Sequence, residues 1–178
     1  MSRIGNKKIE IPPNVLIIFE NQNLCVKGPY GSLFKTLLPN LLLEFNSKEL
    51  TVLRTNNDKQ TRSNHGLMRN LIQNMIEGVS QKFVKILILE GVGYKFQLFN
   101  NKLIVLIGYT HSLEFQIPSE VTILLESVTK IKISGIDKEK VSLFASQIYN
   151  IKPPEPYKGK GIHYEGEIIF RKAGKTKK

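Results

Sequence analysis

The stretch Asn21-Gln22-Asn23-Leu24-Cys25-Val26 decides the fold, because a similar stretch, Asn100-Asn101-Lys102-Leu103-Ile104-Val105, follows later in the chain. Further pairs keep the same spacing: Ser32 and Ser112, Leu38 and Ile117, Pro39 and Pro118, and Asp58 and Asp137. The separation stays at 79 to 80 residues, which indicates an internal repeat. One continuous domain with chance similarity between its turns is the alternative.

Each repeat contains short β-rich runs that Asn, Gly or Pro residues separate, and then one helical pattern. In the first repeat the β-rich runs are Val15 to Phe19, Leu24 to Lys27 and Leu50 to Leu53. We therefore expect an α+β fold of two tandem duplicated domains, each a small antiparallel sheet packed with one helix. Residues 1–81 form the first domain in this prediction, and residues 82–178 form the second.

The helical patterns show which faces should lie in the core. In the first repeat two stripes have i, i+4 spacing: Leu67, Leu71 and Met75, and Met68, Ile72 and Ile76. Gly78 follows as the expected stop signal of this helix. In the second repeat the apolar positions are Val141, Phe144, Ala145 and Ile148. Pro153-Pro154 then prevents the helix from continuing.

The composition narrows the class of partner. The 178 residues include 26 Lys and Arg against 15 Asp and Glu, a formal net charge of +11. Such an excess favours a polyanion, and nucleic acid is the first candidate. Attraction to a membrane surface, or plain solubility, is the alternative that charge alone leaves open. Only 8% of the residues are aromatic and Trp is absent, so few large side chains are available for a small-molecule pocket.

Other features favour a reducing compartment and a protein that stays in the compartment where it is made. Cys25 is the single cysteine, so it forms no internal disulfide, and its apolar neighbours favour a small buried side chain. No apolar run approaches the length of a membrane span, and the N-terminus lacks the apolar core of a secretory signal. Lys, Ile and Asn, whose codons are rich in A and T, are abundant, which indicates the AT-rich genome of an organelle or a bacterium.

The segment from Pro153 to Tyr164 has the composition of an RNA-binding segment. Three prolines hold the chain extended, and the glycines that follow let a partner approach the backbone. Lysines can neutralise phosphates, aromatic rings can stack on bases or riboses, and glycine N–H groups can meet phosphate oxygens. The candidates are Tyr157, Lys158, Gly159, Lys160, Gly161 and Tyr164. A flexible linker to a charged tail is the alternative.

A basic run follows this segment: Arg171, Lys172, Lys175, Lys177 and Lys178, with no acid after Glu167. Such runs stay solvated unless they meet a polyanion, whose released counterions make the contact favourable and salt-dependent. We expect RNA contacts here at Arg171, Lys172 and Lys175. A solvated tail is the alternative.

Over nearly its whole length the chain resembles the ribosomal protein L-six family. The run from Pro154 to Tyr164, followed by Arg171-Lys172-Ala173-Gly174-Lys175, is similar to the family's C-terminal signature. Shorter matches come in the family's order: Ser2-Arg3-Ile4-Gly5, Val26-Lys27-Gly28-Pro29-Tyr30-Gly31, Gly91-Val92-Gly93-Tyr94 and Gly108-Tyr109-Thr110-His111. The chain departs from the family at His163, where Arg is usual, and at Ser112, where Pro is usual.

The resemblance implies a structural constituent of the large ribosomal subunit and no enzyme. The rRNA-binding segment would lie near the sarcin-ricin loop and the stalk base, beside neighbouring large-subunit proteins and where translation factors dock. His163 joins the candidate RNA contacts, with an imidazole that is mostly neutral near physiological pH in place of a permanent charge. The resemblance also implies a plastid ribosome, with a mitochondrion or the cytoplasm of an AT-rich bacterium as alternatives.

Basic residues of the first repeat offer a second set of candidate RNA contacts: Arg3, Lys7, Lys8, Arg62 and Arg69. Arg62 and Arg69 are seven positions apart, so they lie on one side of the first helix. A solvated helix face is the alternative.

The remaining motifs argue against catalysis. Gly91-Val92-Gly93-Tyr94 lacks the third glycine of a dinucleotide-binding fingerprint, so a turn or bulge is expected. His65, His111 and His163 lack metal-ligand spacing and are expected on the surface or in turns. We expect no cofactor, no metal, no membrane contact and no small-molecule substrate. A duplicated domain that binds a protein partner through a free sheet edge is the main rival, and an enzyme is another.

Overall fold

The computed structural model describes residues 4–46 and 48–175. The chain divides into two compact units: unit 1 comprises residues 1–83 with 136–138, and unit 2 comprises residues 84–135 with 139–178. Within the described residues, the two helices are α1 (Lys59–Gln81) and α2 (Lys138–Tyr149), and neither is long and apolar enough to cross a membrane. The predicted α+β class is confirmed, but each helix accompanies two small antiparallel sheets instead of one.

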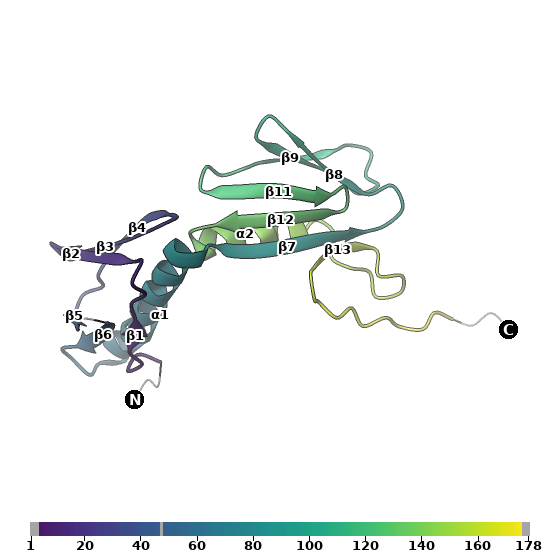
Figure 1. Ribbon diagram of the computed structural model, residues 1–178. Coiled ribbons are helices and arrows are strands. Elements are labelled where there is room, and N and C mark those ends of the chain that lie inside the picture. The colour runs from purple at the N-terminus through teal and green to yellow at the C-terminus, as the bar shows by residue number, and fades with distance from the viewer. Residues whose placement is uncertain (1–3, 47, 176–178) are drawn as a thin grey trace. The chain divides into compact units, whose positions relative to one another are not determined.

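Unit 1 packs helix α1 against strands of both its sheets (Figure 1). One sheet has the order β2-β3-β4, formed by Leu16–Glu20, Asn23–Gly28 and Gly31–Thr36. The other has the order β1-β6-β5, formed by Ile9–Glu10, Glu49–Arg54 and Leu41–Phe45. Leu24 and Val26 of β3 and Met68 and Ile72 of α1 are all fully buried in one core. Their burial follows from strand alternation and from the spacing of one helix face.

Unit 2 contains a three-stranded and a four-stranded sheet (Figure 1). The first has the order β10-β9-β8, formed by Leu113–Gln116, Lys102–Leu106 and Lys95–Phe99. The second has the order β11-β12-β7-β13, formed by Val121–Ser127, Lys130–Gly135, Phe83–Glu90 and Gly161–Tyr164. Helix α2 packs on the four-stranded sheet, and all four apolar positions predicted for it are buried.

The stretch that repeats in the sequence forms the same turn in both units. Asn21 and Gln22 join β2 to β3 with φ angles of 48° and 64°, and Asn100 and Asn101 join β8 to β9 with 43° and 63°. Two consecutive positive φ angles are those of a type I′ hairpin, and Asn tolerates this region better than most residues. The repeat in the sequence is therefore a repeat of hairpin geometry.

Two predictions about α1 need correction. Gly78 does not end the helix, which continues to Gln81. Gly78 is buried, and the carbonyl oxygen of Ile136 occupies the place where a Cβ would be, so glycine is needed for close packing of two backbones. Leu67 is 51% exposed, whereas Met68, on the neighbouring stripe, is fully buried. The core face of α1 is thus narrower than the two stripes indicated.

The expectations for the histidines and for Cys25 also change. His65 is buried inside unit 1, where its Nε2 donates a hydrogen bond to the carbonyl oxygen of Val52 at 2.8 Å. His163 is buried as well, and only His111 is exposed. Cys25 is half-buried, because alternation along β3 turns Leu24 and Val26 to the core and Cys25 to the opposite face. The turn predicted around Gly91-Val92-Gly93 is confirmed.

Candidate nucleic-acid interface

The proline- and glycine-rich segment, residues 153–160, forms a closed loop in unit 2 between α2 and β13. The N–H of Gly159 donates to the carbonyl oxygen of Glu155 at 2.8 Å, and the N–H of Glu155 donates to that of Lys160 at 2.9 Å. At the base of the loop the N–H of Ile162 donates to the carbonyl oxygen of Lys152 at 2.8 Å. The segment is therefore held by its own backbone, in contrast to the flexible linker that the sequence left open.

Two glycines, Gly159 in the loop and Gly161 at the start of β13, serve close packing. Gly161 has a φ of 147°, and a Cβ there would lie 2.7 Å from the carbonyl oxygen of Pro153. Gly159 has a φ of 72°, and a Cβ there would lie 2.9 Å from Nε of Arg171. Gly161 is buried, and the N–H of Gly159 is already bonded within the loop. The structure thus gives these glycines a role that the sequence did not suggest.

Lys152 joins three loops of unit 2 at the base of this segment. Its Nζ donates to the hydroxyl of Tyr94 at 2.7 Å and to the carbonyl oxygen of Ile107 at 3.1 Å. The same ammonium lies 4.8 Å from the ring centroid of Tyr94 and 5.3 Å from that of Tyr109. The Tyr109 hydroxyl in turn donates to the carbonyl oxygen of Ile151 at 3.3 Å. An ammonium that is bonded to two oxygen acceptors and lies close to two tyrosine rings holds its surroundings in place.

Sequence reasoning missed Lys152 because its partners lie in two other motifs. The glycine-tyrosine motifs at residues 91–94 and 108–111 were noticed separately, and nothing in their spacing connects them to Lys152. The glycines and tyrosines that both motifs share were the signal that could have pointed to a common contact. The three loops leave exposed side chains at this end of unit 2, including Val92, Tyr109 and Tyr157.

The predicted RNA contacts within the loop differ in accessibility. Tyr157 is 55% exposed, Lys158 is exposed and Lys160 is half-buried. These three side chains belong to one closed loop. An exposed aromatic ring beside lysines is able to stack on a base while the ammonium groups meet phosphates.

Strand β13 turns the next two candidates towards the protein. His163 is 8% exposed, and its Nε2 lies 3.7 Å from Oε1 of Glu90. The Tyr164 ring stacks on that of Tyr149 with centroids 5.1 Å apart, and Nζ of Lys85 lies 5.5 Å from its centroid. Burial raises the pKa of Tyr164, and the charge of a nearby carboxylate adds to the shift. His163 and Tyr164 therefore offer little free surface to RNA.

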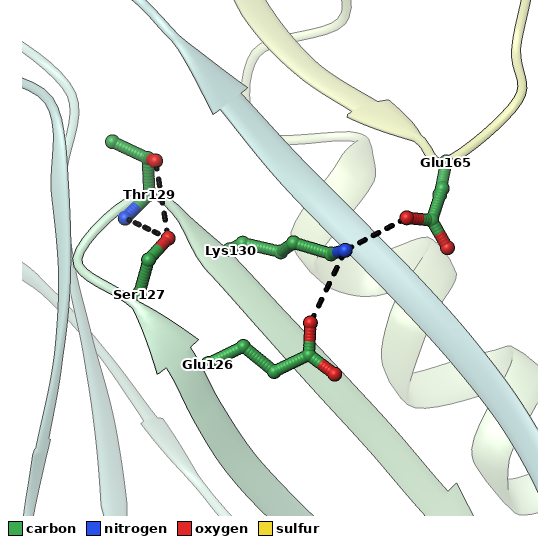
Figure 2. Close-up of polar contacts among 5 residues, drawn as sticks. All are labelled: Glu126, Ser127, Thr129, Lys130 and Glu165. Atoms are coloured by element: carbon green, nitrogen blue, oxygen red, sulfur yellow. Dashed lines mark hydrogen bonds and ion pairs between the residues drawn. The ribbon is translucent and has the colours of Figure 1, made fainter.

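Residues 165–175, called here the C-terminal arm, begin with an attachment through Lys130. Figure 2 shows Nζ of Lys130 between the carboxylates of Glu165, at 2.8 Å, and Glu126, at 3.2 Å. The hydrogen bonds to Glu165 and Glu126 raise the pKa of Lys130. Beside them, the N–H of Thr129 donates to Oγ of Ser127 at 3.3 Å in the turn between β11 and β12. The first acid of the arm is thus bonded to the sheet.

Further contacts continue along the arm. Oε1 of Glu167 accepts a hydrogen bond from the Tyr149 hydroxyl at 3.1 Å, and Oε2 accepts one from the Tyr164 N–H at 2.9 Å. Burial, and then the bond to Glu167, raise the pKa of Tyr149. The N–H of Lys172 donates to the carbonyl oxygen of Pro156 at 2.7 Å, which ties the arm to the loop. The side chains of Lys172 and Lys175 remain exposed.

The candidates in unit 1 include two with partners inside the unit. Lys8 pairs with Glu49 at 2.7 Å, and this hydrogen bond raises the pKa of Lys8. The Arg69 guanidinium donates to the carbonyl oxygens of Lys7 and Lys8 at 3.2 Å and 3.1 Å. Arg62 is exposed on α1. Three basic candidates lie outside the described residues: Arg3, Lys177 and Lys178.

Within residues 4–46 and 48–175, no group of three or more His, Cys, Asp or Glu side chains is arranged to hold a metal ion.

The chain is similar to known ribosomal proteins. The family model described as ribosomal protein L6 matches residues 11–82 and 90–165. The large ribosomal subunit protein uL6c of Porphyra purpurea is 48% identical over 178 residues, which are 100% of this chain and 99% of that protein. The large ribosomal subunit protein uL6 of Staphylococcus aureus (strain JH9) is 44% identical over 178 residues, which are 100% of each chain.

Proposed function

The chain belongs to the ribosomal protein L6 family, which is a structural, non-enzymatic component of the ribosome, and from this membership we propose that it binds large-subunit rRNA. Both the family and the non-enzymatic role predicted from the sequence are confirmed by these relatives. The proposed binding surface is the loop at residues 153–160 together with the exposed lysines of the C-terminal arm.

The closed loop is the observation that carries this proposal. It presents Tyr157 and Lys158 to solvent without the ordering cost that a flexible segment would incur. The backbone bond from Lys172 to Pro156 brings the arm to the same loop, so the arm's lysines extend the basic surface. The net charge of +11, counted over the whole chain, adds a long-range attraction for a polyanion.

The proposed RNA contacts are therefore five members of the predicted set, each exposed or half-buried: Tyr157, Lys158, Lys160, Lys172 and Lys175. Four of the other members are left out because each has a contact within unit 2 at the group that RNA would meet: His163 and Arg171 with Glu90, Tyr164 with the Tyr149 ring, and Gly159 within the loop. Gly161 is left out because it is buried. Lys7, Lys8, Arg62 and Arg69 remain a secondary candidate set in unit 1.

The finer location follows from the resemblance at the C-terminal signature. We place the rRNA contact near the sarcin-ricin loop and the stalk base, with neighbouring large-subunit proteins and the docking region of translation factors close by. A plastid ribosome is the proposed location, supported by the Porphyra purpurea relative; the similar identity of the Staphylococcus aureus relative keeps a bacterial ribosome as the alternative. The domain boundary between residues 81 and 82 also stays a proposal.

The test is a binding titration of the purified protein with a large-subunit rRNA fragment that contains the sarcin-ricin region, at several salt concentrations. An unrelated RNA hairpin of equal length is the comparison. We expect preferential binding that weakens steeply with salt, because neutralised phosphates release counterions. Equal, weak binding to both RNAs would contradict the proposal and favour the protein-partner alternative.

A variant pair locates the binding surface. Lys158→Ala with Lys160→Ala should lower the salt dependence by about one unit of slope for each phosphate that is no longer neutralised. The matched control, Lys27→Ala with Lys35→Ala, removes the same charge from exposed positions on β3 and β4 of unit 1. Equal losses of affinity in both double variants would show that only total charge matters.

A further inference from the structure

Glu90 at the end of β7 faces basic side chains from two later segments. Its Oε2 lies 3.3 Å from Nη2 of Arg171 in the arm, and its Oε1 lies 3.7 Å from Nε2 of His163 on β13. The guanidinium of Arg171 also lies against Gly159, where a Cβ would come within 2.9 Å of it. One carboxylate therefore stands where the loop at residues 153–160, the arm and the sheet meet.

The Glu90–Arg171 pair acts as one of several attachments of the arm. An exposed ion pair stabilises little by itself, and here the side chains are 42% and 58% exposed. The arm has further attachments, among them Glu165 to Lys130, Glu167 to Tyr149 and to the Tyr164 N–H, and the Lys172 N–H to Pro156. Arg171 comes directly before Lys172 in the chain, so the Glu90–Arg171 pair restrains the part of the arm that borders the loop.

The charge of Glu90 works against the proposed function. A carboxylate beside a surface that binds RNA repels phosphates, so electrostatics alone would favour its removal. We infer that Glu90 is a positioning residue, which holds Arg171 over the loop and keeps the arm ordered before RNA arrives. Arg171 then contributes by its ion pair with Glu90, and it does not bind a phosphate. The consequence for RNA rests on the proposed function, whereas the order of the arm is a property of unit 2 alone.

The first test measures amide hydrogen exchange in the full chain without RNA. Glu90→Ala should speed exchange at the Lys172 N–H, which is bonded to Pro156, and leave the core amides of β12 protected. Arg171→Ala should do the same, and it changes no residue of the sheet. The control Glu114→Ala removes another exposed acid of unit 2, one paired with Lys102, and should change neither group of amides. Unchanged exchange at Lys172 in Glu90→Ala and Arg171→Ala would overturn the inference.

The second test measures affinity for the rRNA fragment. Glu90→Ala and Arg171→Ala change the net charge in opposite directions, yet both should weaken binding, by about tenfold, because a free arm must be ordered on binding. The control Glu114→Ala should bind as well as the unchanged protein or slightly better. The Arg171→Ala salt slope should stay the same, whereas removal of a direct phosphate ligand would lower it by about 0.7 to 0.9.

The outcomes distinguish the positioning role of Glu90 from the proposed rRNA binding. Tighter binding by Glu90→Ala, or a reduced slope in Arg171→Ala, would overturn the positioning role, since charge and direct phosphate binding would then explain the data. In the double variant, a loss of affinity no larger than that of either single change supports a shared route. Failure of the unchanged protein to prefer rRNA would overturn the proposed function, while the exchange measurement would still decide whether Glu90 orders the arm.

Discussion

Replacement of Lys152 by Met should destabilise unit 2, because it removes the ammonium that joins three loops and keeps most of the aliphatic stem. Two hydrogen bonds from Nζ disappear, to Tyr94 and to Ile107. Bonds to a charged group are worth about 1.5–3 kcal/mol each, but Lys152 is only half-buried, so solvent screening reduces that value. The absence of a cation beside the Tyr94 and Tyr109 rings adds about 0.5 kcal/mol at a partly exposed site. We expect unit 2 to be destabilised by about 2 kcal/mol in total.

The assay is urea unfolding followed at amides of unit 2, because two compact units need not unfold in one step. Lys102→Met is the matched control: Lys102 lies on β9 of the same unit, and its ammonium makes an exposed pair with Glu114. The control should change the free energy of unfolding by no more than about 0.5 kcal/mol. Equal effects of the two replacements, or a destabilisation below about 0.5 kcal/mol for Lys152→Met, would refute the reasoning.

Three further outcomes are expected. Gly161→Ala should cost about 1–3 kcal/mol of stability in chemical denaturation, because its positive φ and the Pro153 carbonyl leave no room for a Cβ. The control is Gly166→Ala, where φ is also positive but the space is open, so the difference between the two variants gives the cost of the steric clash apart from that of backbone strain. Ile72→Ala should cost about 2–5 kcal/mol in unit 1, since Ile72 is fully buried, and an unchanged urea midpoint would contradict the core assignment. The raised pKa of Tyr149 means that its contribution to stability is complete below the unfolded pKa and is lost as pH rises through the folded pKa. The free energy of unfolding should therefore fall above about pH 10, and Tyr149→Phe should flatten that fall in pH-dependent denaturation.

Local patterns predicted much of the fold. The pairs Asn21-Gln22 and Asn100-Asn101 indicated turns, and both form hairpins with positive φ. The spacing of Val141, Phe144 and Ile148 marked the buried face of α2. These features depend on neighbouring residues alone, so they can be predicted from the sequence.

Predictions that depended on distant contacts were less successful. Gly78 has the composition of a helix stop, but it accommodates the backbone of Ile136, 58 positions later in the chain. His65 looks like a surface residue until the Val52 carbonyl that it bonds is known. The same residue type serves both purposes, and only the folded chain distinguishes them.

In the candidate site, too, the local features were predicted from the sequence and the contacts between distant residues were not. Proline and glycine around Tyr157 and Lys158 indicated an exposed segment, and both side chains are exposed. The glycine-to-Arg171 contact, the Glu90 pair and the Lys152 contacts join residues from separate parts of the chain. Composition suggested that all basic and aromatic residues here face a partner, whereas folding assigns some of them to hold the others.

Strand β13 pairs antiparallel with the outer edge of β7, with Ile162 fully buried beneath it. During synthesis this edge has no neighbour until residues 161–164 have been added, because the covering strand comes so late in the chain. An uncovered strand edge invites pairing with other chains. A chain that stops before β13 keeps the residues of the loop, but it lacks the bond from Ile162 to Lys152 at the base of the loop and the whole C-terminal arm. It also keeps a sheet edge prone to aggregation, so aggregation and damage to the rRNA surface would occur together.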